Sequence, residues 1–352
     1  MAITKFVPEI WAATLLSTLE KSLVFAGAPC VNRNYEGEIS QRGDTVHITS
    51  FGAPSIVDYT KDTDLTIETL TDAEQTLLID QAKAFAFEVD DIDMRQMQNG
   101  GAAMTQAAKD AAYGLRDVAD RYVAARMSLS AGNALGVVNA ATATNVYDTL
   151  IVPARTKLSR ANVPTEGRFM VLAPEVTERL LLDARFVKVN ESGDDSALRN
   201  GVIGRIGGFN ILESNNAALS NRAITASVAV ATTAKTLTAA AGTFSRGDIG
   251  LTVTGTNIAA STVIASVNAD GSVATMDKNG SAAASQTDTV LSGGGYVAIA
   301  GSSIATSYAE QINKVEAFRP EKRFADALKG LHLYGAKVVR PSGLVVASVK
   351  VS

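Results

Sequence analysis

NRNYEGEISQRGDTVHITSFGAPSIVDYTKDTDLTIETLTDAEQTLLIDQAKAFAFEVDDID, residues 32–93, is a long, polar and extended stretch. Val46 and Ile48 alternate with polar neighbours, and Phe85 and Phe87 alternate with alanines, which is the period of a β-strand. Between these two runs, Gly, Pro and Asp favour turns and solvent. An isolated two-stranded ribbon is marginal in water. We therefore expect a neighbouring subunit to hold this stretch, which points to assembly rather than catalysis.

The composition predicts a globular protein with a packed core. The chain has 352 residues, of which 46% are hydrophobic and 19% charged. The net charge is −4 and the pI is about 5.4. No run of Lys and Arg occurs, so the chain is not built to grip nucleic acid through phosphates. Enclosing nucleic acid without gripping it is compatible with this charge.

Cysteine content and hydropathy indicate where the protein assembles. Cys30 is the only cysteine, so no internal disulfide forms, which is compatible with a reducing cytoplasm. The N-terminal MAITKFVPEIW lacks the basic and apolar regions of a signal peptide. No apolar run approaches the length of about 18 residues that a membrane span needs. We expect a soluble protein that is not exported by a signal peptide.

Residues 8–26 predict an amphipathic helix that starts near Pro8 and stops at Gly27 and Pro29. Its apolar stripe repeats every four residues and consists of Trp11, Leu15, Leu19 and Leu23. Two docking partners for this stripe stay open, namely another subunit and the chain's own domain.

Residues 101–129 carry the strongest helix signal. At 1.5 Å per residue this helix is about 40 Å long, the dimension of a structural beam. Two i,i+4 ion pairs are predicted, Arg116 with Asp120 and Asp117 with Arg121. The expected apolar stripe is Met104, Ala108, Ala111, Leu115, Val118 and Tyr122.

The central part of the chain alternates helices and strands. Small residues at 130–144 predict a loop, and the glycines at 204, 207 and 208 predict tight turns. The elements expected here are a helix at 145–161 capped by Thr144 or Asn145 and kinked at Pro153, a buried strand at Phe169–Leu172, a helix from Pro174 to Leu182, a polar loop at 190–201 and a strand region at 203–212.

Composition changes sharply at residues 223–292. This stretch is rich in Ala, Thr, Ser, Val and Gly, contains no Glu, and has Phe244 as its only aromatic residue. Short alternating runs predict strands at Leu251–Val253, Val263–Val267 and Val273–Met276. We interpret the stretch as a small all-β module inserted into another domain, since an exposed loop tolerates insertion.

The C-terminal residues predict strands. One is expected at Lys314–Phe318, followed by the polar connection RPEKRFAD. A closing β-pair, Leu331–Val339 with Leu344–Val349, is expected around the turn at 340–343.

Residues able to carry catalysis or bind metal are sparse. His47, His332 and Cys30 are too few for a metal cluster or a Cys/His couple. Carboxylates gather in two places. We interpret the first group as a solvated strand end or as intersubunit ion pairs; it consists of Glu88, Asp90, Asp91 and Asp93. We interpret the second group as a polar loop, because it lacks EF-hand spacing; it consists of Glu191, Asp194 and Asp195.

Two short motifs have structural interpretations. The glycines at 201, 204, 207 and 208 are not followed by a GK[ST] sequence, so tight turns explain them better than a nucleotide site. Arg246-Gly247-Asp248 spells an adhesion-like tripeptide, which we interpret as a β-turn. An enzyme is the least supported class, and we predict no catalytic, cofactor or metal site.

The chain resembles the tailed-bacteriophage major capsid proteins of the Hong Kong 97 fold, in their coat-protein branch. Four strings carry the resemblance: VPEIWAATLLSTLEKSLV at 7–24, NRNYEGEISQRGDTVHI at 32–48, LTDAEQTLLIDQAKAFAFEVDDID at 70–93 and GLHLYGAKVVRP at 330–341. The resemblance covers most of the chain outside 223–292.

The resemblance implies an α+β subunit with an inserted small all-β domain of Ig-like character. Within residues 32–93, the loop at 36–80 would lie over a neighbouring subunit. The implied parts are an N-arm at 1–31, the extended loop and first peripheral-domain strands at 32–93, the spine helix at 94–144, the axial domain at 145–222, the inserted domain at 223–295, the axial return at 296–310 and the peripheral return at 311–352.

The resemblance also implies a function. Copies of the chain would form hexamers and pentamers of an icosahedral virion shell, assembled in the host cytoplasm, that encloses double-stranded DNA without sequence-specific binding. A portal protein is an expected partner, and no membrane partner is expected. Because the chain starts directly at the arm, the resemblance implies a separate scaffolding protein or none. The expected assembly contacts are Trp11, Leu15, Leu19, Tyr35, Arg42, Tyr59 and Lys61.

Some proteins of this fold cross-link a loop lysine to an asparagine near the C-terminus. Lys61 lies in the corresponding loop, but the final residues, VVASVKVS, contain no asparagine. We therefore expect a non-covalent clasp.

Two alternatives stay open. One is an encapsulin-type compartment, which protein cargo and a lack of nucleic acid would indicate. The other is a carbohydrate-binding surface adhesin that acts through residues 223–295, which glycan binding by this module would indicate.

Overall fold

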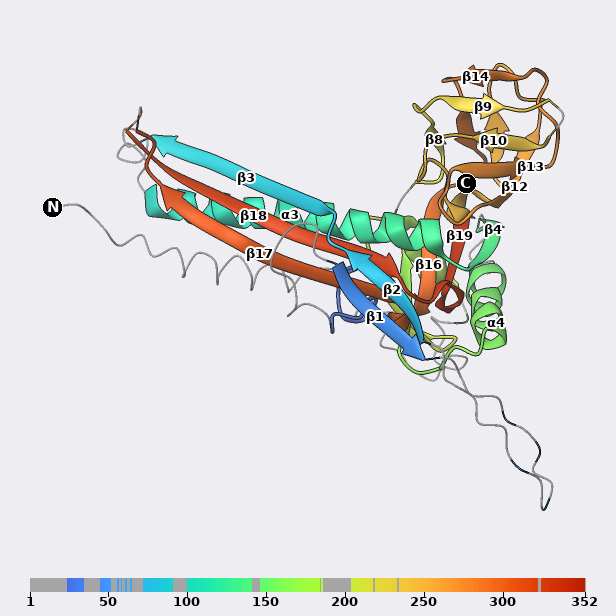
Figure 1. Ribbon diagram of the computed structural model, residues 1–352, viewed down its shortest axis with the longest axis horizontal. Helices are drawn as coiled ribbons and strands as arrows, with labels where there is room; N and C mark the ends of the chain where they lie inside the picture. The colour runs from blue at the N-terminus through green and yellow to red at the C-terminus, as the bar shows by residue number, and fades with distance from the viewer. Residues whose placement is uncertain are drawn as a thin grey trace.

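The computed structural model describes residues 24–34, 45–51, 56, 58, 61, 64, 72–90, 100–140, 146–183, 185, 204–217, 219–232, 234–321 and 324–351. They form three regions (Figure 1). A long helix lies along a three-stranded sheet, a six-stranded sheet carries short helices at one end of this layer, and an all-β domain stands beside that end.

The long helix is α3, Gly100–Ser130. Its 31 residues extend about 46 Å, so the predicted beam is confirmed. The predicted stripe is rotated, however, because Val118 is exposed and alanines take the inner positions. Alanine lets the helix approach the sheet closely. The buried side chains along the inner face are Ala108, Ala112, Leu115, Ala119, Val123 and Met127.

The sheet beneath α3 has the order β17-β18-β3 and is antiparallel. Phe85 and Phe87 point towards α3 and pack with Leu328, as their predicted alternation requires. The predicted strand at 314–318 is part of a much longer one. The strands are β3 Gln81–Asp90, β17 Thr306–Phe318 and β18 Ala325–Val338.

Within residues 32–93, the first predicted strand pairs with a different strand from the expected one. β1, Thr45–Phe51, pairs with β2, Asp72–Leu78, and not with the Phe85 strand. Ile48 and Leu77 pack on Leu333 of β18. The base of the ribbon is therefore supported by its own chain, a contact that the expectation of a neighbouring subunit did not include.

The six-stranded sheet has the order β4-β19-β16-β5-β7-β6. Every residue of β5 is buried, as predicted, and Gly207 and Gly208 form the β6–β7 turn with φ of 58° and 90°. The strands are β4 Asn133–Asn139, β19 Leu344–Lys350, β16 Tyr296–Ser302, β5 Arg168–Leu172, β7 Phe209–Glu213 and β6 Arg205–Ile206.

Two predictions are wrong in this sheet. Residues 133–139 are a strand rather than a loop, because β4 pairs in parallel with β19 and obtains its hydrogen bonds there. The closing β-pair also does not form. The 3-10 turn η5, Pro341–Gly343, leads the chain from β18 in one sheet to β19 in the other.

Short helices cover the six-stranded sheet. The π-helical turn η2, Tyr147–Ile151, continues into α4, Val152–Arg160. Pro153 is the second residue of α4 and has no N–H to donate, which accounts for the irregular hydrogen bonding at the junction with η2. α5, Pro174–Leu181, follows as predicted. No helix in the described part of the chain is long and apolar enough to cross a membrane.

The inserted stretch is all-β, as predicted, and its strand pairs are all antiparallel in the order β14-β9-β10-β13-β12-β11-β15-β8. It has its own core around Phe244. Its strands are β8 Arg222–Ala223, β9 Val228–Val230, β10 Thr236–Thr238, β11 Thr252–Thr254, β12 Thr262–Val267, β13 Val273–Met276, β14 Ala284–Gln286 and β15 Val290–Ser292.

Several predictions concern residues outside the described ones. These are nearly all of the helix at 8–26, its stripe, the cap at Thr144 or Asn145, and the loop at 190–201.

Candidate functional site

Asp120 of α3 anchors the segment 24–34. Its Oδ1 accepts hydrogen bonds from the backbone N–H groups of Val24 (3.1 Å), Phe25 (2.7 Å) and Ala26 (3.2 Å). Its Oδ2 accepts one from Asn216 Nδ2 at 2.9 Å. The side chain is buried, and successive N–H dipoles compensate its charge. One carboxylate thus joins the N-terminal segment, α3 and the residues after β7.

A second anchor binds the same segment to β17. Asn32 N–H donates to Thr306 O at 2.8 Å, and Tyr308 N–H donates to Asn32 O at 3.0 Å. Arg33 forms an ion pair with Glu310 and lies over the ring of Tyr308, 5.6 Å from its centroid. The backbone and side chains of the segment are therefore both attached to the sheet.

His332 lies beside this ion pair. Its Nε2 is 3.2 Å from Glu310 Oε2, and Tyr308 Oη donates to the same oxygen at 2.6 Å. Burial lowers the pKa of His332 to about 4, and the nearby charge of Arg33 lowers it further. The imidazole is therefore neutral at neutral pH.

The segment also contributes to the main core. Phe25, Ala26, Cys30 and Val31 are buried against α3 and the two sheets. Burial raises the pKa of the Cys30 thiol, and the charge of Asp120 acts in the same direction. A thiol protonated to this degree is a poor nucleophile.

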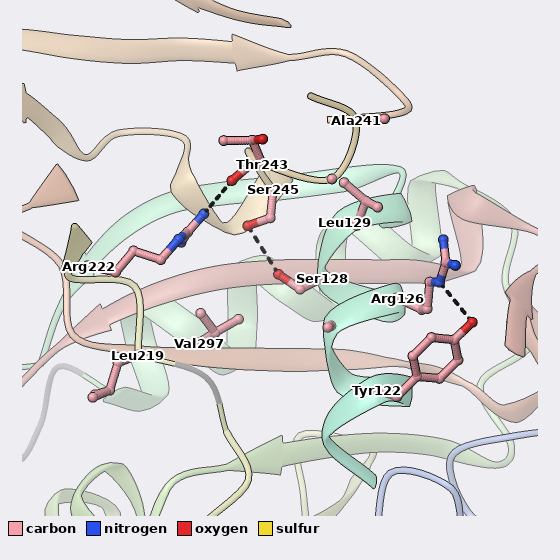
Figure 2. A pocket seen from close by; sticks show the side chains of 12 residues that line it. Tyr122, Arg126, Ser128, Leu129, Leu219, Arg222, Ala241, Thr243, Ser245 and Val297 are labelled. Atoms are coloured by element: carbon pink, nitrogen blue, oxygen red, sulfur yellow. Dashed lines mark hydrogen bonds between the residues drawn. The ribbon is translucent and has the colours of Figure 1, made fainter. Parts of the chain in front are cut away.

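A cleft of about 480 Å³ lies between α3 and the inserted domain. Figure 2 shows Tyr122, Arg126 and Leu129 of α3 on one side and Arg222, Thr243 and Ser245 on the other. Both arginines are engaged with carboxylates. Arg126 Nη2 lies 2.9 Å from Asp80 Oδ2, and the Arg222 guanidinium lies 2.6 and 2.7 Å from the two oxygens of Asp248.

The predicted assembly residues fall mostly outside the described part of the chain. Lys61 is described and is exposed in a turn. The predicted contacts that lie outside are Trp11, Leu15, Leu19, Tyr35, Arg42 and Tyr59. The structure instead anchors the segment 24–34 at two places, through Asp120 and through the Arg33–Glu310 ion pair. The sequence had predicted Asp120 only as an ion-pair partner of Arg116. Asp120 could have been recognised from the sequence as a buried anchor, because it is an aspartate beside the inner face of an alanine-rich helix.

The remaining motifs are structural. Arg246–Asp248 is the 3-10 turn η3, in which Gly247 and Asp248 are buried, so the tripeptide is not displayed for adhesion. Glu88 and Asp90 lie on the exposed side of β3. Among the described residues, no group of His, Cys, Asp and Glu is arranged to hold a metal ion.

Comparison with known proteins gives structural neighbours only: no protein-family model and no curated protein matches the sequence. A structure from Mycobacterium phage Che8 is 27% identical, with a TM-score of 0.60 over 93% of this chain and 91% of that one.

Two capsid structures share the fold at lower identity. The capsid of cyanophage P-SCSP1u is 16% identical, with a TM-score of 0.58 over 95% of this chain and 90% of that one. The mature capsid of bacteriophage PhiM1 is 12% identical, with a TM-score of 0.53 over 91% and 87%. In its fold, the chain thus resembles the major capsid proteins of tailed phages.

Proposed function

We propose that this chain is the major capsid protein of a tailed phage and that its copies assemble into an icosahedral head enclosing double-stranded DNA. The observation that carries the proposal is the fold, which matches phage capsid structures over more than 90% of the chain. The net charge of −4 suits a wall that encloses DNA without gripping it. Assembly in the host cytoplasm, a portal protein and a separate scaffolding protein complete the proposal.

The described elements suit the parts of a Hong Kong 97-type subunit. α3 is assigned as the spine helix, and the sheet β17-β18-β3 as the peripheral domain. The six-stranded sheet is assigned to the axial domain. We retain the boundaries 1–31, 32–93, 94–144, 145–222, 223–295, 296–310 and 311–352 for the N-arm, extended loop, spine, axial, inserted, axial-return and peripheral-return parts, and Ig-like character for the insert. The exceptions are β4 and β19, which we assign to the axial domain because they belong to the six-stranded sheet.

Exposed apolar side chains support burial between subunits. Phe324, beyond the distal end of β17, is 80% exposed, and Tyr113 on the outer face of α3 is 63% exposed. Contacts between subunits at these positions would remove this apolar surface from water. In the proposed shell, the loop at 36–80 reaches over a neighbour, and Lys61 contacts it without a covalent bond.

The alternatives have less support. The encapsulin-type compartment is not favoured, because the neighbours described above come from phages and their capsids. A carbohydrate-binding role of the insert would benefit from an aromatic ring that stacks on a sugar. Phe244, its only aromatic residue, is fully buried.

Electron microscopy of the purified full chain, with its scaffolding protein added, tests the proposal. We expect closed icosahedral particles. Phe324→Ser should reduce their yield, whereas the control Asp270→Ser, at an exposed position of the insert, should not. Subunits that stay monomeric under all assembly conditions would refute the shell role. Particles purified from infected cells that hold protein cargo and no nuclease-protected DNA would refute the phage head.

A further inference from the structure

The turn η3, Arg246–Asp248, is held rigidly by the inserted domain that contains it. Asp248 is fully buried and accepts a hydrogen bond from Ser245 N–H at 2.7 Å. Arg222 approaches from β8, pairs with both oxygens of Asp248, and also donates to Thr243 O at 3.1 Å. A partly buried, charge-assisted ion pair with these additional hydrogen bonds fixes the position of the turn.

This turn also contacts the rest of the subunit. A Cβ on Gly247 would lie 3.0 Å from Ser128 Oγ of α3 and 3.4 Å from Val346 Cγ2 of β19. The φ of Gly247 lies outside the left-handed region, so close approach rather than backbone conformation accounts for a glycine here. Arg246 Nη1 donates to Gly132 O at 3.2 Å, and Figure 2 shows Ser128 hydrogen-bonded to Ser245.

Two further glycines of the insert lie close to the rest of the subunit. At Gly250 a Cβ would lie 3.0 Å from Val137 N of β4, and at Gly271 it would lie 2.6 Å from Leu129 Cδ1 of α3. Val137 itself packs against the core of the inserted domain. The domain therefore touches the end of α3, β4 and β19 together.

Hydrogen bonds at the two ends of the insert, near residues 220–221 and 294, restrict its movement relative to the six-stranded sheet. Asn221 Nδ2 donates to Gly294 O at 3.0 Å, and Gly294 N–H donates to Asn221 Oδ1 at 2.9 Å. Ser220 Oγ is 2.6 Å from Ser348 Oγ of β19. Both ends of the insert are thus fixed to each other and to the sheet.

We propose that the inserted domain has a further function as an internal clamp that holds β4 and the last turns of α3 on the six-stranded sheet. β4 is an edge strand with β19 as its one sheet neighbour. Its sequence, NALGVVN, includes glycine and asparagine, which disfavour strands. The clamp covers the side of β4 at Val137. This function belongs to the single subunit, so it holds whether or not the chain forms a shell.

Hydrogen–deuterium exchange of the full-length chain, kept unassembled, tests the clamp from both sides. Gly247→Leu adds a bulky side chain on the insert side of the contact and should push η3 away from α3. Ser128→Leu adds one on the α3 side and should have the same effect, and leucine favours helix at this position. The matched control is Ala229→Leu, at an exposed position of β9.

Both variants should raise the exchange rates of β4 and of residues 124–130 about tenfold or more. The strands β10, β12 and β13 should keep their protection, and the control should match the wild type. Unchanged exchange in β4 and α3 in either variant would overturn the proposal. Loss of protection in β10, β12 and β13 in both variants would also overturn it, because the contact would then serve the insert's own fold.

Discussion

Replacing Asp120 with alanine should detach the segment 24–34 from α3. The carboxylate accepts three backbone N–H groups and one amide group. Each hydrogen bond to a charged acceptor contributes about 1.5–3 kcal/mol, but the three that share Oδ1 are not additive. Removing the buried acceptor leaves donors unpaired, and we expect a loss of about 3–5 kcal/mol in the free energy of unfolding.

Urea unfolding of the unassembled subunit measures this loss, and amide exchange at Phe25 and Ala26 locates it. Asp120→Asn keeps one oxygen without the charge and should lose roughly half as much. The control Asp117→Ala removes the exposed i,i+4 pair with Arg121 (2.6 Å) and should cost at most about 0.5 kcal/mol. An Asp120→Ala subunit with wild-type stability and wild-type protection at Phe25 would refute the anchor.

Two further predictions concern buried titratable groups. The pKa of His332 falls from 6.5 to about 4 in the folded state, so below pH 6.5 the unfolded chain binds the proton first and stability decreases, by up to about 3 kcal/mol near pH 4. His332→Gln should lose less stability than the wild type in urea titrations between pH 7 and pH 4; identical losses would contradict this. Cys30 should react with a thiol reagent at pH 8 only as the subunit unfolds, and rapid labelling of the native protein would show that the thiol is accessible.

Local periodicity predicted the elements whose environment follows from their own residues. α3 shows a helical repeat over its whole length, and β5 is a short apolar run that is buried on both sides. The inserted domain was visible as a change in composition with a single aromatic residue at its core. Each of these signals lies within one continuous stretch, so no knowledge of distant residues was needed.

Pairing between distant residues could not be predicted in the same way. β1 pairs with β2, whose polar sequence DAEQTLL does not show the apolar alternation that predicts a strand. β4 is a strand because β19, about 200 residues away along the chain, supplies its hydrogen bonds. The assembly residues proposed in the N-arm and the loop lie mostly outside the described part of the chain and stay predictions.

The sequence by itself determined the long helix, the inserted all-β domain and the resemblance to phage capsid proteins, because apolar period and composition are written along the chain. Only the tertiary structure decided that Asp120 binds the N-terminal segment and that Arg246–Asp248 is a buried contact rather than an exposed motif. A hydrogen bond or close packing contact depends on which distant backbone comes within a few ångströms, and that distance is set by the whole fold.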